Sequence, residues 1–94
     1  MRLYNVEINA LNNALSGVKG EVYLFGSRVD DDKKGGDIDI LILTQDNSFK
    51  TSHEVSVKFF MECEEKIDVV VMNPKNLKPE QEAFLKVISK VKFR

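Results

Sequence analysis

The chain has 94 residues, which is enough for one compact domain and too few for two. A hydrophobic fraction of 43% and a charged fraction of 31% are typical of a globular protein with a small core. The 14 basic and 15 acidic residues give a net charge of −1, which provides no overall electrostatic footprint for nucleic acid or an anionic membrane.

The cysteine and histidine content argues against several kinds of site. Cys63 is the single cysteine, so the chain has no internal disulfide and no cysteine pair for a zinc knuckle. We interpret Cys63 as a small packing residue rather than a nucleophile paired with His53. No apolar run is long enough to form a transmembrane helix. Together these features indicate a reducing, cytoplasmic setting.

The first half of the chain is predicted to form a helix and two strands. Residues 2–16 carry apolar side chains at roughly helical spacing, and Gly17 and Gly20 supply stop signals. Residues 21–25 read as a short strand. Residues 37–43 read as a strand that is apolar on both faces after its first three residues, which is typical of the middle of a covered sheet.

The second half is predicted to form a helix, a strand and a helix. Residues 51–66 fit both an alternating and a helical pattern, and we favour a helix opened by a capping box of Thr51 and Glu54. Residues 66–72 form the third predicted strand. Residues 79–92 form the last predicted helix, which begins with a proline. Its buried stripe is predicted to contain Phe84, Leu85, Val87, Ile88 and Val91.

The lengths of the connections predict how the strands pair. Residues 26–36 form a short, glycine-containing connection, which favours an antiparallel first pair. Residues 44–65 are long enough for a helical crossover, which favours a parallel second pair. The predicted fold class is therefore α/β (α+β), with a small mixed sheet of about three strands flanked by helices in the order α-β-β-α-β-α.

Under this topology Gly26, Ser27, Asp37, Asp39 and Asp68 converge at one edge of the sheet. Asp37 and Asp39 point to the same face, because side chains alternate along a strand. Three carboxylates at one edge repel each other and are costly to desolvate, and a hard cation such as Mg²⁺ removes both problems. Gly26 lets a backbone approach closely, and Ser27 can donate to a phosphate oxygen. The set favours metal-assisted chemistry on a nucleoside triphosphate.

Each of these signals also has a plainer interpretation. Gly-Ser is a common turn dipeptide, and an aspartate at the start of a strand, including Asp68 taken alone, is often structural. Residues 30–32 are interpreted as a solvated acidic loop, and Lys33 and Lys34 as solvated side chains. Arg28 and these lysines could instead add positive charge near a phosphate. The joint order and convergence of the signals favour a site.

The combined motif resembles the DNA polymerase beta-like nucleotidyltransferase superfamily. Gly26-Ser27 is followed by nine residues and then by "DID" at 37–39, and "KIDVVV" supplies Asp68 as the third carboxylate. The short length and the "FGSR" opening are most similar to the minimal nucleotidyltransferases. The resemblance covers nearly the whole chain, so residues 1–94 are interpreted as a single minimal nucleotidyltransferase domain.

The resemblance implies a fold, a reaction and roles for the motif residues. The reaction would move a nucleoside monophosphate from a nucleoside triphosphate, most simply ATP, to a hydroxyl acceptor with release of pyrophosphate. Asp37, Asp39 and Asp68 would be the catalytic and metal-binding residues for two Mg²⁺ ions, and Asp68 would help to activate the attacking hydroxyl. The nucleotide-binding residues would be Gly26, Ser27 and Arg28.

The resemblance also implies a partner. Minimal nucleotidyltransferases are commonly paired, as antitoxins, with a separate helical HEPN toxin, and some adenylylate a tyrosine on that partner. Two other interpretations stay open: a non-catalytic module that neutralises a partner by complex formation, and a structural domain whose aspartates are surface residues. An interface with a partner or in a homodimer is predicted among the apolar residues Phe49, Phe59, Phe60, Met61 and Phe93.

Overall fold

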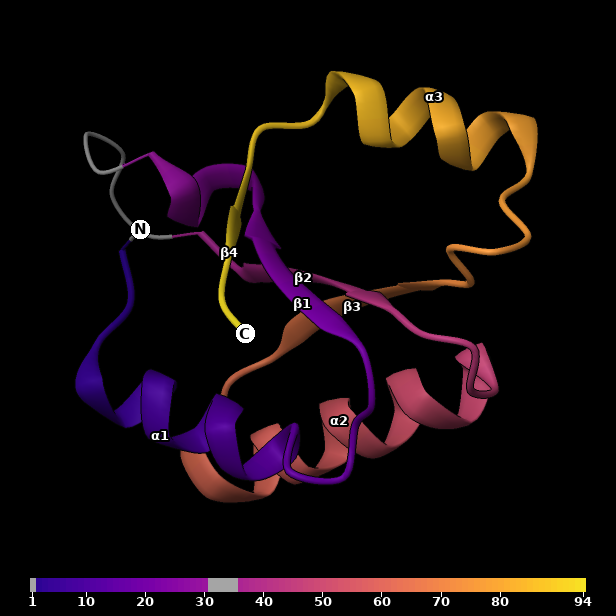
Figure 1. Cartoon of the computed structure of the whole chain (residues 1–94). Helices are drawn as coiled ribbons and strands as arrows, with labels where there is room; N and C mark the ends of the chain where they lie inside the picture. Colours follow the sequence, from indigo (N-terminus) through magenta and orange to yellow (C-terminus); the bar gives the residue numbers. More distant parts are fainter. Residues whose placement is uncertain (1, 31–35) are drawn as a thin grey trace.

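The computed structural model describes residues 2–30 and 36–94. These residues form a four-stranded mixed sheet with helices on both of its faces (Figure 1). In chain order the elements are α1 (Asn5–Ala14), β1 (Glu21–Phe25), the short 3-10 helix η1 (Gly26–Val29), β2 (Ile38–Leu43), α2 (Ser48–Cys63), β3 (Ile67–Met72), α3 (Pro79–Val87) and β4 (Lys90–Lys92).

The sheet has the strand order β3-β2-β1-β4, and its pairing confirms the predicted directions. β1 and β2 are antiparallel, and β2 and β3 are parallel and joined through α2. Phe25, the last residue of β1, lies opposite Asp39, and Asp39 lies beside Asp68 in register. The end of β1 and the starts of β2 and β3 therefore meet at one edge, as the connection lengths predicted.

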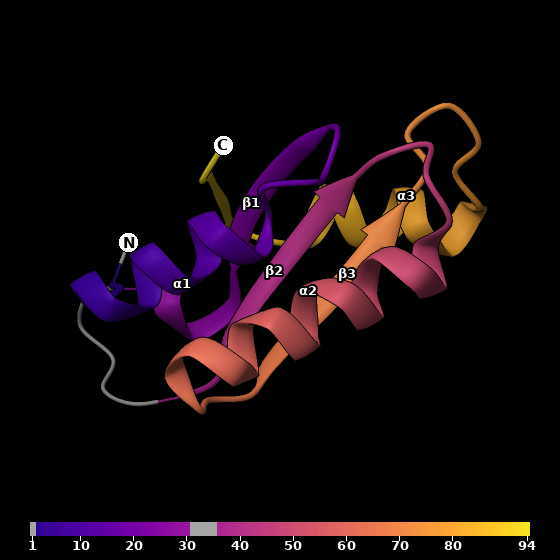
Figure 2. The ribbon, with the colours of Figure 1, turned by 90° about the horizontal axis from the view of Figure 1, so that it is seen from below.

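The core lies between the sheet and the pair of helices α1 and α2, which cover the same face (Figure 2). Ile38, Ile40 and Ile42 of β2 all point into this layer, because alternate side chains of a strand share a face. They pack with α1, β1 and α2 through Ala10, Leu11, Ala14, Leu15, Val22, Leu24, Val55 and Phe59. Asp39 is consequently on the other face of the central strand, outside the apolar core.

The prediction of a helix over 79–92 is confirmed for residues 79–87 and wrong for residues 88–92. α3 ends at Val87, and Ile88 adopts an extended backbone with φ −79° and ψ 144°. Residues 90–92 then form β4, antiparallel to β1, which extends the sheet by an edge strand. The valine and isoleucine content of this segment suits a strand as well as a helix, and hydrogen bonding to β1 decides the outcome.

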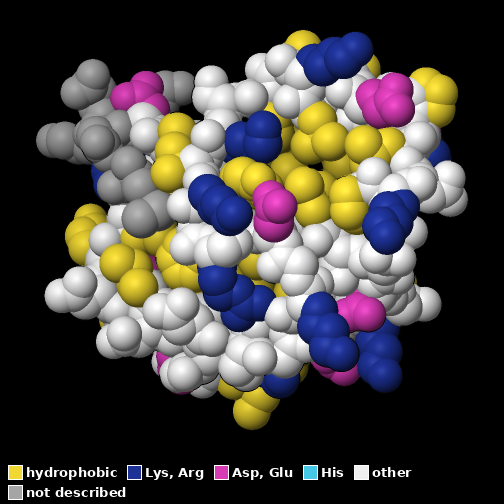
Figure 3. Space-filling view, viewed as in Figure 1, with side chains coloured by type: hydrophobic (Ala, Val, Ile, Leu, Met, Phe, Trp, Pro, Cys, Tyr) yellow, Lys and Arg dark blue, Asp and Glu magenta, His cyan; other side chains and the backbone are white. Residues whose placement is uncertain are grey.

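The predicted buried stripe of the last helix is also wrong, because α3 contains no buried residue. Val87 is 79% exposed. α3 touches the sheet through Phe84, whose ring meets the ring of Phe25 edge to face with centroids 5.5 Å apart. Hydrophobic side chains are visible at the surface beneath α3 (Figure 3). α3 is therefore a lightly packed cover on the second face of the sheet.

The helical interpretation of the ambiguous middle segment is confirmed, but its start differs. α2 begins at Ser48 after Asn47, whose Oδ1 accepts a hydrogen bond from the Lys50 backbone N–H at 2.8 Å. Thr51 is buried inside the helix, so the predicted capping box is wrong. The asparagine is a favourable N-cap, and it lengthens the helix by one turn at its start.

The end of α1 and the exposure of the predicted interface residues are the remaining points of comparison with the prediction. α1 ends at Ala14, slightly earlier than the predicted residue 16. Among the predicted interface residues, Phe59 is buried in the core, whereas Phe49, Phe60 and Met61 are exposed. In the described part of the chain, no helix has the length and apolar content needed to cross a membrane.

Candidate active site

Asp39 and Asp68 form a pair of carboxylates at the edge where the strands begin. They are neighbours across the parallel strands β2 and β3. Burial, a side-chain hydrogen bond with Asp68, and the negative charges of Asp68 and Asp37 together raise the pKa of Asp39. Two carboxylates held this closely compete for one proton unless a cation neutralises them. The sheet thus holds together two anionic groups that repel each other.

Asp37 stands beside this pair but is less enclosed. It lies just before the first residue of β2, is exposed, and acts on Asp39 through its charge. Within residues 2–30 and 36–94, no three acidic, histidine or cysteine side chains converge as a complete metal site. The structure therefore presents a carboxylate pair with a third carboxylate nearby, and the predicted triad is drawn together only in part.

Gly26 lies against the Asp39 carboxylate at the end of β1. Its backbone has φ +76°, and a Cβ atom added there would lie 2.2 Å from Asp39 Oδ2. Both the left-handed conformation and the lack of space require glycine at this position. The glycine of the "GS" motif therefore allows the backbone of η1 to approach the carboxylate pair directly.

Replacement of Gly26 by alanine is expected to lower the free energy of unfolding by about 1–3 kcal/mol, because a left-handed alanine is strained and displaces Asp39. Urea unfolding of Gly26→Ala measures this loss. Gly17→Ala is the matched control, since nothing lies within 4 Å of a Cβ there. That control should be neutral or stabilised by up to about 1 kcal/mol. Equal losses in both variants would contradict the assigned contact.

Ser27 lies in η1 with its hydroxyl next to Gly36, immediately before Asp37. Gly36 has φ +87°, and an added Cβ atom there would be 2.4 Å from Ser27 Oγ. The connection between β1 and β2 thus brings its two ends together beside the carboxylates. This role of Gly36 was not predicted, although the glycine pair directly before "DID" was a usable signal. Residues 31–35, including Lys33 and Lys34 of the predicted charged loop, lie outside the described residues.

Arg28 is placed differently from the predicted triphosphate ligand. Its side chain is 6% exposed and forms an ion pair with the fully buried Glu7, with Nη1 2.8 Å from Oε1. The remaining donors are directed at protein acceptors, among them the carbonyl oxygen of Gly36. The hydrogen bonds that Arg28 donates to Glu7 raise the pKa of Arg28, which stays charged. Arg28 points into the protein and away from a phosphate at the sheet edge.

A groove of about 360 Å³ opens beside the carboxylates, between α2 and the edge strand β3. Asp37 and Asp68 form one part of its wall, and the rest is mostly apolar. The other lining residues are Ser56, Val57, Phe60, Met61, Lys66 and Ile67. A substrate group in this groove would therefore contact both the carboxylates and an apolar surface.

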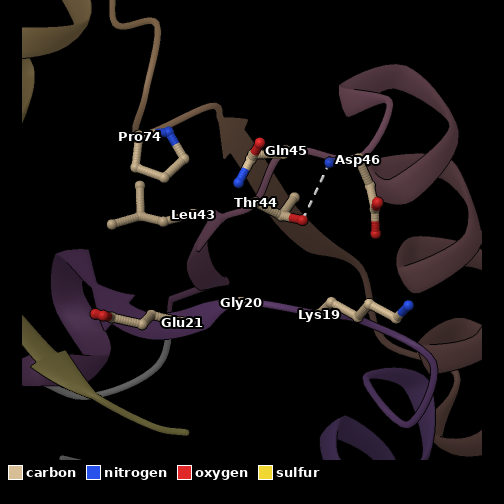
Figure 4. A pocket seen from close by; sticks show the side chains of 8 residues that line it. All are labelled: Lys19, Gly20, Glu21, Leu43, Thr44, Gln45, Asp46 and Pro74. Carbon is tan, nitrogen blue, oxygen red and sulfur yellow. Dashed lines mark hydrogen bonds between the residues drawn. The ribbon is translucent and has the colours of Figure 1, made fainter.

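A second hollow, of about 390 Å³, lies at the opposite end of the sheet (Figure 4). It is near Leu43, four residues and roughly 13 Å along β2 from Asp39. Figure 4 shows the Asp46 backbone N–H donating to Thr44 Oγ1 on its floor. Its charged side chains, from Lys19, Glu21 and Asp46, come from separate positions around the rim. It has no registered carboxylate pair, so the edge with Asp39 and Asp68 is the stronger candidate.

The comparisons with known proteins identify the family of the chain. No curated protein gave a significant match to the chain. The family described as "Polymerase beta, Nucleotidyltransferase" matches residues 7–90. This range includes Gly26, Ser27, Asp37, Asp39 and Asp68, and extends from α1 to the start of β4. Since the match covers most of the chain, the protein belongs to the polymerase beta nucleotidyltransferase family, and its function is of the nucleotidyltransferase type.

Proposed function

We propose that this chain transfers a nucleoside monophosphate from a nucleoside triphosphate, ATP in the first instance, to a hydroxyl group in the presence of Mg²⁺. The observation that carries the proposal is the registered pair of Asp39 and Asp68 with the backbone of Gly26 beside it. The motif order and the family match support a nucleotidyl transfer at these residues. Nucleotidyltransferases of this family typically use a divalent metal ion, and we assign its binding to this pair.

The donor set fits a magnesium ion. Mg²⁺ usually takes oxygen ligands from one or two carboxylates, with water and substrate phosphates completing its shell. Asp39 and Asp68 supply such a pair, and Asp37 adds a third carboxylate close to them. When bound, Mg²⁺ would neutralise the carboxylates and stabilise the charge that develops on the transferred phosphate. The pair therefore needs no complete protein cage to hold the ion.

The strand order also supports an in-line arrangement of the substrates. The Gly26-Ser27 turn ends β1, Asp39 lies on β2 and Asp68 on β3, so the three groups follow one another across the sheet. Neighbouring strands are about 4.8 Å apart. With the β- and γ-phosphates at Ser27 and the α-phosphorus at Asp39, the attacking hydroxyl would approach from Asp68. That direction is opposite to the departing pyrophosphate.

The reaction assigned to this arrangement is a single displacement. The acceptor oxygen forms a bond to the α-phosphorus, the bond from that phosphorus to the bridging oxygen breaks, and pyrophosphate leaves. Asp68, the exposed member of the pair, takes the proton of the attacking hydroxyl. Ser27 donates a hydrogen bond to a phosphate oxygen, and Asp37 and Asp39 would hold the metal ion that neutralises the α-phosphate.

The acceptor is proposed to be a hydroxyl on a separate protein, of the helical HEPN type, which this chain would counter as an antitoxin. The groove next to Asp68 supports an acceptor that approaches with apolar contacts, since Phe60 is 50% and Met61 77% exposed. These exposed side chains are also where a homodimer would form. A partner bound through them would bring its hydroxyl to the open side of the carboxylate pair.

Label transfer from α-labelled ATP tests the proposal. With Mg²⁺ and cell lysate as the source of acceptors, the protein should produce a labelled protein band. Chelation of Mg²⁺ by EDTA should reduce the label to background, and excess Mg²⁺ should restore it. Label that persists in EDTA would contradict a metal-dependent reaction. A tight complex with a lysate protein without any label would favour the non-catalytic binding module.

A further inference from the structure

We propose that Arg28 and Glu7 are positioning residues that set the geometry of the three site segments, and that Arg28 does not contact the nucleotide. The kinetic part of this inference rests on the proposed nucleotidyl transfer, whereas its structural part does not. The pair connects α1 with the turn that follows β1, 21 residues along the chain. Both residues are buried, with Glu7 0% and Arg28 5% exposed as whole residues.

Four hydrogen bonds to protein oxygens and one longer ion-pair contact surround the Arg28 guanidinium. Nη1 donates to Glu7 Oε1 at 2.8 Å and to the Arg2 carbonyl at 3.0 Å. Nη2 donates to Glu7 Oε2 at 3.0 Å and faces Glu65 Oε1 at 4.0 Å. Nε donates to the Gly36 carbonyl at 3.1 Å. Four of its five donors are therefore used within the protein, and the fifth faces a carboxylate from a buried position, which leaves the guanidinium poorly placed to bind a phosphate.

These contacts join the segments that carry the site residues. Arg28 itself follows Ser27 in η1. Its Nε atom holds the carbonyl of Gly36, which directly precedes Asp37. Its Nη2 atom faces Glu65, which lies three residues before Asp68 in the connection from α2 to β3. One rigid, planar group therefore sets the relative positions of the Gly-Ser turn and the starts of β2 and β3.

The start of the chain fixes the guanidinium in turn. The Tyr4 backbone N–H donates to Glu7 Oε1 at 2.9 Å, so the carboxylate is held from two sides. The Arg2 backbone N–H donates to the Arg28 carbonyl at 2.7 Å, which ties the segment before α1 to η1. The connection from β1 to β2 is thus held at both ends by Arg28: at η1, which contains this residue, and at Gly36, whose carbonyl accepts from it. Arg28 is in turn held by Glu7 of α1.

A buried ion pair is a weak device for stability alone. The cost of desolvating two charges often offsets their attraction, and an apolar pair of similar volume would be equally stable. The ionic contact adds a fixed orientation of the joined segments. The planar guanidinium restricts the directions of its hydrogen bonds, whereas apolar packing imposes no such directions. The catalytic geometry needs such fixed directions within fractions of an ångström.

The test compares Arg28→Lys with Arg94→Met at a temperature where both remain folded. Lysine keeps the charge, but its single ammonium group cannot contact the Glu7 carboxylate, the Gly36 carbonyl and the Glu65 carboxylate at the same time. Arg94 is a matched control, since it also donates to backbone carbonyls, those of Leu15 and Val18, away from the site. Amide chemical shifts in ¹H–¹⁵N spectra report where each variant changes the structure.

In Arg28→Lys we expect shifted amides at Ser27, at Asp37–Asp39 and at Asp68, with the opposite end of the sheet near Leu43 unchanged. Arg94→Met should leave the site amides in place. Shifts in Arg28→Lys that are confined to α1 and η1 would overturn the positioning role. This readout needs no activity, so it decides the inference even if nucleotidyl transfer itself fails the label test.

The kinetic arm separates positioning from ligand binding. In Arg28→Lys we expect kcat to fall roughly 10- to 100-fold, because misplaced reacting groups lose rate more than affinity. KM for MgATP should stay within about twofold of the native value. A large rise in KM with unchanged kcat would show that Arg28 binds the nucleotide and would overturn the inference.

Discussion

Asp39→Asn is expected to remove nucleotide transfer while increasing the stability of the fold at neutral pH. Asparagine keeps the size of the side chain but removes the negative charge that would hold a metal ion, and with it the metal contact to the α-phosphate. Loss of several kcal/mol of transition-state stabilisation corresponds to a decrease in kcat on the order of a thousandfold. The label-transfer assay measures this loss directly.

The gain in stability follows from the raised pKa of Asp39. Burial, the hydrogen bond with Asp68 and the neighbouring charges favour the protonated carboxyl in the folded state. The folded state therefore holds the proton more tightly than the unfolded state, whose reference pKa is 3.8. As pH rises from this value through the raised folded pKa, stability falls, and the cost persists at neutral pH. The Asp39→Asn variant has no such cost, because an amide side chain does not ionise.

Urea unfolding at several pH values tests this trade between function and stability. The stability difference between Asp39→Asn and the native protein should be small near pH 3.5 and increase toward neutral pH. Asp46→Asn, at the opposite end of the sheet, serves as the control. It should leave activity unchanged and should change the free energy of unfolding by no more than about 0.5 kcal/mol. An Asp39→Asn protein that is less stable at neutral pH would contradict the like-charge account of the pair.

Glu7→Ala is expected to have the largest effect on stability. It leaves the buried guanidinium of Arg28 without its carboxylate, which costs about 3–5 kcal/mol when one partner of a buried pair is removed. A domain of this size has a total stability of only about 5–15 kcal/mol, so the variant should lose a large share of its stability. Urea unfolding monitored by circular dichroism gives the difference.

Glu62→Ala provides a control for this prediction. Glu62 also accepts a hydrogen bond between helices, from Asn13 Nδ2 at 2.7 Å, but both side chains are exposed. Its loss should cost less than about 1 kcal/mol, because water replaces the contact. Similar losses for the two variants would mean that the Glu7–Arg28 pair is not buried in solution.

The pH dependence of the pair has the opposite sign to that of Asp39. Burial raises the pKa of Glu7, but the hydrogen bonds from Arg28, Tyr4 and Glu65 outweigh it, and the pKa of Glu7 is lowered below 4.5. Its contribution to stability is complete above that value and is lost as pH falls through the lower folded pKa. Acid unfolding of the native protein should therefore be steeper below pH 4.5 than that of Glu7→Ala.

The carboxylate pair could be predicted from the sequence because local rules determine it. Alternation along 37–43 places Asp37 and Asp39 on one face, and the crossover through α2 aligns Asp39 with Asp68. No local rule links Glu7 with Arg28, since the two are 21 residues apart and each is an ordinary charged residue in its own segment. The resemblance to phosphate-binding relatives favoured a ligand role for Arg28, whereas burial against α1 directs it inward.

The last segment of the fold also differs from its prediction because a distant contact determines its structure. Residues 79–92 satisfy a helical pattern throughout, and Pro79 correctly marks the first turn of α3. The helix nevertheless ends at Val87, because Lys90–Lys92 pair with the open edge of β1. Pairing with residues 90–92 satisfies backbone groups on the open edge of β1. A lightly packed helix gains little by continuing through the same residues. Such competition between distant partners cannot be read from periodicity.

The most direct test of the central claim is the location of a bound metal–nucleotide complex. Mn²⁺ with a non-hydrolysable ATP analogue broadens the amide signals of residues close to the ion in ¹H–¹⁵N spectra. The carboxylate-pair account predicts selective broadening at Gly26, Asp39 and Asp68, and its loss in Asp39→Asn. Broadening at the opposite end of the sheet around Leu43 and Thr44, or equal broadening in Asp39→Asn, would contradict it.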